Sequence, residues 1–170
     1  MNSPLFYSKI LLFGEYGIIK NSKGLSIPYN FFKGGLKLGD LSNESIKESN
    51  KTLNGFADFL FKIKSSLVEF ENIKIKEDLR KGMYFDSTIP RGYGVGSSGA
   101  IVAAFYEKYA LNKITVLENL TKVKLLTLKK IFSEMEAYFH GTSSGLDPLN
   151  SYLSLPILIQ SKNNVETTGI

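Results

Sequence analysis

Apolar residues recur mostly at intervals of three and four between Asn43 and Ser66, a spacing that predicts a helix with one buried face. The positions on this face are Ile46, Leu53, Phe56, Leu60, Ile63 and Leu67. A similar pattern predicts a longer helix over Thr115–Phe139, and the alanine-rich apolar segment Ser98–Ala110 predicts a buried helix. The charged segment Glu71–Lys81 carries three apolar residues, and its pattern leaves a strand and a short helix equally open.

Other segments are rich in β-branched and aromatic residues, which is typical of strands. They are Leu5–Ile19, where two apolar strands are joined at Gly14 and Glu15, then Leu25–Pro28, and Met83–Ile89. Pro90 ends the last of these, because proline has no backbone N–H for a strand ladder. The final residues, Val165–Ile170, have the composition of a strand and turn region.

Composition narrows the class of protein. The chain has 170 residues, of which 43% are hydrophobic and 22% charged, an ordinary globular balance for one domain. No apolar run approaches the roughly 18 residues that span a bilayer, and the order of residues in a signal peptide is missing. The sequence has no cysteine, which excludes disulfides and thiolate metal sites. We therefore expect a cytoplasmic protein that has no membrane partner.

The net charge of +5 is modest, and the lysines are scattered among glutamates instead of being grouped with aromatic residues. This pattern favours a small anionic substrate over a nucleic acid.

The segment Pro90–Ala100 concentrates glycines and hydroxyls between a predicted strand and a predicted helix. Glycine allows positive φ and a close approach of backbone N–H groups to an anion, and a helix N-terminus adds unpaired donors. The segment therefore predicts a phosphate-binding loop. Its candidate binding residues are Gly92, Gly94, Gly96, Ser97, Ser98 and Gly99.

Three motif families can be compared with this loop. A P-loop requires a lysine after the glycines, and none follows here. The dinucleotide pattern G-x-G-x-x-G is matched by Gly94, Gly96 and Gly99, and Glu118 stands near the expected distance of about 20 residues, but no clear strand lies between the loop and Glu118. The third pattern, P-x-x-x-G-x-G-S-S, resembles the central motif of the GHMP kinases, with Val95 in place of their usual leucine and Gly99 in place of alanine.

Two further segments resemble motifs of the same family, especially of its mevalonate kinases. Lys9-x-x-Leu12-x-Gly14-Glu15 resembles the first motif, with Tyr16 where histidine is usual. The segment His140–Asp147 resembles H-G-x-P-S-G-x-D, with Ser143 where proline is usual, so this loop is less constrained. Three motifs in order are a specific signal.

The resemblance implies an α+β fold, that of the N-terminal domain of GHMP kinases, with a mixed or antiparallel sheet and helices packed on one side. Residues 1–170 would form this ATP-binding domain. Nothing after Ile157 resembles the family's third glycine-rich motif, so we expect an N-terminal piece that lacks the C-terminal domain.

The resemblance also implies residue roles. Asp147 would be the catalytic carboxylate, with Lys9 beside it, and Ser98 and Glu136 would hold Mg²⁺ while the loop holds ATP. Glu15 and His140 would lie on the substrate side. Without the resemblance, His140 is a packing residue at a helix end, and Asp147 before Pro148 is a candidate helix cap.

The implied activity is an ATP-dependent kinase acting on a small alcohol, with mevalonate in isoprenoid synthesis as the leading substrate. Phosphomevalonate, homoserine or a sugar remains an alternative substrate. A homodimer also remains open. From other classes, a dinucleotide-dependent oxidoreductase and a non-catalytic nucleotide-binding module stay open.

Overall fold

The computed structural model describes residues 4–14, 23–63, 65–90, 92–115, 120–161 and 164–167. Its elements, in chain order, are β1 (Phe6–Phe13), β2 (Gly24–Leu38), α1 (Glu44–Leu60), α2 (Asn72–Arg80), β3 (Met83–Ser87), α3 (Ser97–Tyr109), α4 (Lys122–His140), α5 (Leu146–Leu153), β4 (Ile157–Ser161) and β5 (Asn164–Thr167).

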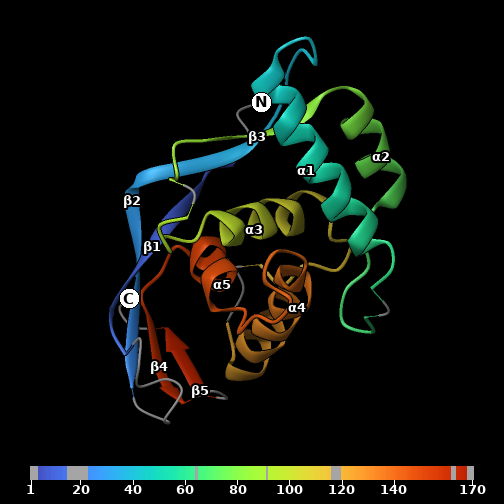
Figure 1. Cartoon of the computed structure of the whole chain (residues 1–170). Coiled ribbons are helices and arrows are strands. Elements are labelled where there is room, and N and C mark those ends of the chain that lie inside the picture. Colours follow the sequence, from blue (N-terminus) through green and yellow to red (C-terminus); the bar gives the residue numbers. More distant parts are fainter. Residues whose placement is uncertain are drawn as a thin grey trace.

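The long strand β2 organises a five-stranded sheet (Figure 1). Its 15 residues are enough to pair with β1, β3 and β4, and β5 then extends the sheet beyond β4. All of these pairings are antiparallel. A dinucleotide-binding fold is built on parallel strands joined by crossover helices, so the sheet found here contradicts that alternative.

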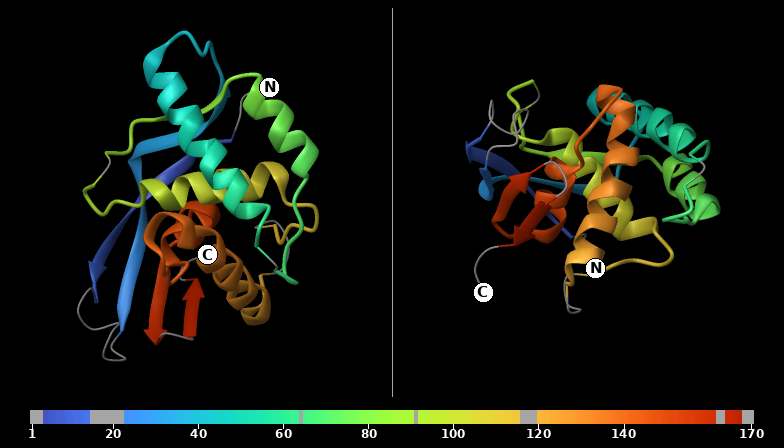
Figure 2. Two further views of the ribbon diagram at one scale, coloured as in Figure 1. Left: turned by 45° about the vertical axis from the view of Figure 1, so that its right-hand side comes forward. Right: turned by 90° about the horizontal axis from the view of Figure 1, so that it is seen from below.

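The helices lie on one face of the sheet (Figures 1 and 2). Helix α3 runs through the middle of this layer, and its segment from Gly99 to Tyr106 is buried throughout. Phe105 of α3 packs edge to face on Phe56 of α1, with ring centroids 4.9 Å apart. The α+β fold with an antiparallel sheet and helices on one side is therefore confirmed, and α3 is the buried helix that the alanine-rich segment predicted.

Several predicted boundaries were wrong. Helix α1 ends at Leu60 and not at Ser66, because tight turns follow its C-cap Phe61: the Lys62 N–H donates to the Phe59 carbonyl and the Ile63 N–H donates to the Leu60 carbonyl. Helix α4 begins at Lys122, since the Thr121 side chain accepts a hydrogen bond from the Lys124 N–H and caps the helix there.

The structure also resolves the ambiguous segments. Residues 72–80 form the helix α2, and the predicted strand Leu25–Pro28 is one part of the much longer β2. The prediction missed the extension because it runs through Gly34 and Gly35, which do not favour a strand locally but pair with β3. The second predicted strand, which would run from Glu15 to Ile19, lies outside the described residues, and so does Glu118.

Candidate functional site

The glycine-rich loop leaves β3 and ends at the N-terminus of α3. Gly92, Gly94 and Gly96 all have positive φ, between 68° and 85°, which favours glycine at each position. A side chain at Gly92 or Gly94 would meet no atom within 4 Å, so the backbone of the loop is open on that side. Gly96 precedes α3, and no side chain caps this helix end. Such a loop suits an anion that approaches the backbone N–H groups.

Strand β1 is tied directly to this loop. The Lys9 N–H donates to the Val95 carbonyl at 3.1 Å, and the Lys9 side chain passes Gly96, where a Cβ would lie 3.2 Å from Lys9 Cγ. Lys9 Nζ then lies 3.0 Å from Asp147 Oδ1. The lysine side chain is 13% exposed and the aspartate 35% exposed, so the carboxylate is the member of the pair that solvent reaches more easily.

Asp147 is held by α5 and by close packing against α3. Gly145, with a φ of 74°, is the N-cap of α5, so Asp147 lies in the first turn and is not the cap. At Gly99 of α3, an added Cβ would lie 2.7 Å from the Asp147 carbonyl carbon and 2.7 Å from the Pro148 nitrogen. The absence of a side chain at Gly99 therefore allows α5 to bring Asp147 to the start of α3.

A second group of polar side chains lies between α3 and α4. Ser98 donates a hydrogen bond to Glu136 Oε1 at 3.0 Å, and His140 Nε2 lies 2.9 Å from the same hydroxyl oxygen. A hydroxyl has one proton to give, so the histidine nitrogen is the donor to Ser98 when Ser98 donates to Glu136. Ser143 donates to the other carboxylate oxygen, Glu136 Oε2.

Glu136 is only 3% exposed. Burial raises the pKa of its carboxyl above the ordinary value, and the negative charge of Asp147 acts in the same direction. The hydrogen bonds from Ser143 and Ser98, together with His140, act against this rise in pKa. The carboxylate is thus buried among three groups that favour its charged form.

Ser98 and Glu136 supply oxygen donors that fit a magnesium ion. Mg²⁺ commonly takes one or two protein oxygens and completes its shell with water and substrate phosphates. No group of three or more histidine, cysteine or acidic residues that could hold a metal occurs in the described part of the chain. One hydroxyl and one carboxylate beside the glycine-rich loop would therefore suit a metal that also takes ligands from a bound phosphate.

The structure brings most of the predicted site residues to the N-terminal end of α3. Lys9, Gly96, Gly99 and Asp147 meet there, and Ser98, Glu136 and His140 form the adjoining group. Of the remaining loop residues, Gly92 and Gly94 are exposed and Ser97 is half-buried. Glu15 lies outside the described residues.

Sequence reasoning missed the contact between Ser143 and Glu136. The only signal for it was a hydroxyl at a position where the resemblance leads one to expect proline. The chain leaves the helix at Gly141, so helical periodicity does not predict that Ser143 returns to Glu136.

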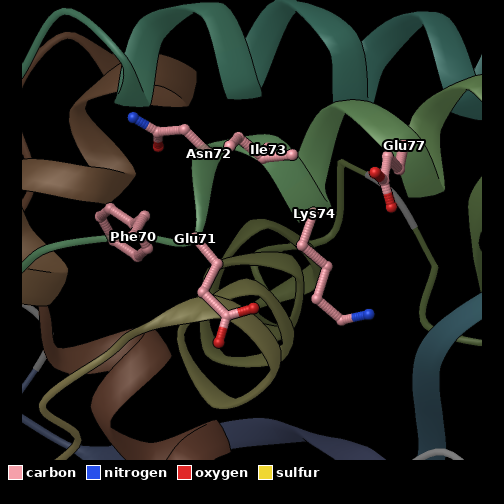
Figure 3. Close-up of a pocket in the computed structure, with 6 residues that line it drawn as sticks. All are labelled: Phe70, Glu71, Asn72, Ile73, Lys74 and Glu77. Carbon is pink, nitrogen blue, oxygen red and sulfur yellow. The ribbon is translucent and has the colours of Figure 1, made fainter.

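One surface hollow lies away from this group. It is lined by Phe70, Glu71, Asn72, Ile73, Lys74 and Glu77 (Figure 3). The Glu71 N–H donates to the carbonyl of Tyr109, the last residue of α3, which places the hollow at the opposite end of that helix. Ile73 is 78% exposed, and the hollow takes no part in the arrangement around Asp147.

Comparison with known proteins decides the family. The model of the GHMP kinases N terminal domain matches residues 53–154, which is more than half of the chain. The chain belongs to the GHMP kinase family. The matched residues of this GHMP kinase domain include the glycine-rich loop, Glu136 and Asp147. No curated protein matches the sequence.

Solved structures of mevalonate kinases share the fold. The enzyme from Methanococcus jannaschii gives a TM-score of 0.54 at 15% identity, over 99% of this chain and 56% of that one. The L. major mevalonate kinase in complex with R-mevalonate gives a TM-score of 0.51 at 17% identity, over 93% of this chain and 48% of that one. The GHMP kinase domain thus spans about half the length of both.

No helix among the described residues has the length and apolar character of a membrane span.

Proposed function

We propose that this chain is the nucleotide-binding, N-terminal part of a two-domain kinase that transfers the γ-phosphoryl group of ATP to a small alcohol. The observation that carries the proposal is the pair Lys9 and Asp147, 3.0 Å apart, beside the glycine-rich loop at the N-terminus of α3. A carboxylate, an ammonium group and an open loop of backbone donors are groups that can position an alcohol and stabilise charge in phosphoryl transfer.

Phosphoryl transfer depends mainly on positioning and on neutralising charge. The backbone of Gly92, Gly94, Gly96, Ser97, Ser98 and Gly99 would hold the phosphates. Ser98 and Glu136 would hold the Mg²⁺ that accompanies ATP, and this ion supplies positive charge to the phosphates. The order of these groups along the chain supports that assignment, because the loop ends at Gly96, the N-cap of α3, and Ser98 lies in the first turn of that helix.

Asp147 would accept, or orient, the proton of the alcohol hydroxyl as its oxygen bonds to phosphorus and ADP leaves. Lys9 would pair with this carboxylate and offset negative charge on the transferred group. His140 contacts Ser98 in this structure, so a direct part in substrate binding would require the ring to contact the alcohol from there. Glu15 is proposed for the substrate side on the motif alone.

Mevalonate is the leading alcohol. The support is the fold shared with two mevalonate kinases, one of them in complex with R-mevalonate, and the motifs at Lys9 and His140–Asp147. The departures at Tyr16 and Ser143 lie in these same motifs, so other alcohols belong in the test.

The decisive experiment measures Mg²⁺-dependent release of ADP from ATP by the complete protein. Mevalonate, phosphomevalonate, homoserine and galactose are supplied separately, and a reaction without alcohol gives the background. We expect release with mevalonate alone. Release with another alcohol would keep the site and change the substrate, whereas ATP binding without release would identify a non-catalytic nucleotide-binding module.

A further inference from the structure

Ser143 lies in the loop between α4 and α5, at the centre of a set of hydrogen bonds. Its hydroxyl donates to Glu136 Oε2 and accepts from the Gly145 N–H at 3.0 Å. Its backbone carbonyl accepts from the Ser133 hydroxyl. One side chain therefore joins the carboxylate on α4 to the residue that caps α5.

The chemistry of a hydroxyl makes both side-chain contacts possible at once. Serine has one proton to donate and two lone pairs to accept with, so the bond to Glu136 and the bond from Gly145 do not compete. A proline at this position has no side-chain donor or acceptor and could make neither contact. Ser143 thus supplies a function that the expected residue of the motif lacks.

The contact fixes the direction in which Glu136 presents its charge. The carboxylate is 3% exposed, and hydrogen bonds to its oxygens offset the cost of burying it. Ser143 engages Oε2, so Oε1 faces Ser98 and the phosphate-binding loop. A partial rotation of the carboxylate would cost the bond to Ser143, so one carboxylate oxygen is kept on the side of Ser98.

We infer that Ser143 is a positioning residue, which orients Glu136 Oε1 toward a nucleotide-bound divalent cation while it fixes the first turn of α5. This inference rests on the proposed function, because it assumes that MgATP is the ligand of the site. It adds a residue whose effect is exerted through Glu136, without contact to substrate.

The test is calorimetric binding of ATP to the complete protein, once with excess Mg²⁺ and once with EDTA. Ser143→Ala removes both side-chain contacts. Substitution of a residue that supports a metal ligand typically lowers affinity for the metal by about 10-fold or more. We expect the dissociation constant of MgATP to rise by about 10-fold while that of metal-free ATP stays unchanged. Ser143→Thr retains the hydroxyl and should restore tight binding of MgATP.

Ser133→Ala is the matched control. It removes the bond to the Ser143 carbonyl but leaves the Ser143 side chain on Glu136. We expect it to lower the melting temperature without altering the ratio between the two dissociation constants. If Ser143→Ala does not fold, Ser143→Cys takes its place, because a thiol is a weak donor of similar shape and should give the same loss.

The outcomes separate the inference from the proposed function. If the unmodified protein binds ATP no more tightly with Mg²⁺ than with EDTA, the proposed function fails and the inference fails with it. If Mg²⁺ strengthens binding equally in the unmodified protein and in a folded Ser143→Ala or Ser143→Cys variant, only the inference is overturned. An equal loss in Ser133→Ala would likewise overturn it, because the effect would then belong to the loop as a whole.

Discussion

At the residue scale, the ion pair of Lys9 and Asp147 is the central feature of the site. The carboxylate lies 3.0 Å from the ammonium group and is more exposed than its partner. The ion pair with Lys9 holds the carboxylate in place, and an exposed carboxylate can reach a hydroxyl that enters from solvent. These two properties are what a group that accepts or orients a proton needs.

Asp147→Asn should lower turnover by about 100-fold or more while ATP affinity changes little, because the lost interaction belongs mainly to the transition state. Turnover and ATP binding are measured separately on the complete protein. Asp86→Asn is the control, since Asp86 forms a similar pair with Lys37 at 2.6 Å but both side chains are about half exposed. Equal turnover in the two variants would remove Asp147 from the mechanism.

Glu136→Gln keeps the shape of the side chain and removes its charge. We expect the Mg²⁺ concentration for half-maximal activity to rise by about 10-fold or more, because a neutral amide is a weaker ligand for a hard cation. A Mg²⁺ titration at fixed ATP measures the change. Glu44→Gln, at a carboxylate that is 85% exposed, serves as the control. An unchanged Mg²⁺ requirement in Glu136→Gln would refute the assignment of this carboxylate as a metal ligand.

At the element scale, the approach of α3 to α5 sets the site. The two helices meet where Gly99 leaves room for the backbone of Asp147 and Pro148. α5 is also tied to the sheet, because the Ser151 hydroxyl donates to the Tyr7 carbonyl at 2.8 Å. A displacement of α5 would therefore move Asp147 relative to Lys9 of β1.

Gly99→Ala tests this packing. Alanine favours a helix by about 1 kcal/mol over glycine, but a Cβ here would meet backbone atoms that cannot rotate away, and overpacking costs about 1–3 kcal/mol. We expect a lower melting temperature and a lower turnover. Gly55→Ala in α1 is the matched control, because the atoms nearest its Cβ belong to the outer end of the Tyr138 side chain and not to backbone. Gly55→Ala should therefore lower the melting temperature less, and the reverse order would contradict the packing argument.

At the scale of the whole molecule, a buried polar contact joins α2 to α3, and we expect it to contribute to stability. Asp78 accepts hydrogen bonds from the Tyr109 hydroxyl and from Lys108, each at 2.8 Å. Burial acts to raise the pKa of Asp78, but the bonds from Lys108 and Tyr109 outweigh it and hold the pKa below the ordinary value of 3.8. A lowered pKa means that the charged carboxylate stabilises the folded state above pH 3.8, and that this contribution is lost as the pH falls through the folded-state pKa.

Asp78→Asn should therefore lower the free energy of unfolding at pH 7 by about 2 kcal/mol, typical of a lost hydrogen bond to a charged group. The difference from the unmodified protein should shrink as the pH is lowered below the ordinary carboxyl pKa. Thermal unfolding followed at several pH values measures both effects. Asp86→Asn should change stability by less than about 1 kcal/mol, because its ion pair is exposed. A difference for Asp78→Asn that does not depend on pH would contradict the assignment.

The sequence predicted much of this molecule because many of its determinants are local. Apolar spacing follows the period of a helix, so α1 and α4 were recognisable, although two of their ends were set by a tight turn and by the Thr121 cap. The buried helix α3 was recognisable from its apolar, alanine-rich composition. Glycines with positive φ are required by the loop itself, so the loop before α3 was also readable. The family followed from three motifs in order, and the match over residues 53–154 confirms it.

Only the tertiary structure decided which distant side chains meet. Strand β2 passes through two glycines because its partner β3 supplies the hydrogen bonds, and no local preference foretells that pairing. Lys9 reaches Asp147 because β1 is bonded to the loop at Val95 and α5 packs on Gly99. Ser143 reaches Glu136 because the chain reverses between α4 and α5. The sequence by itself determined three of the helices, the glycine-rich loop and the residue types available for chemistry, because helical periodicity and glycine conformation are local properties and residue types are read directly. The contacts that orient those residues depend on long-range packing, which a one-dimensional pattern does not record.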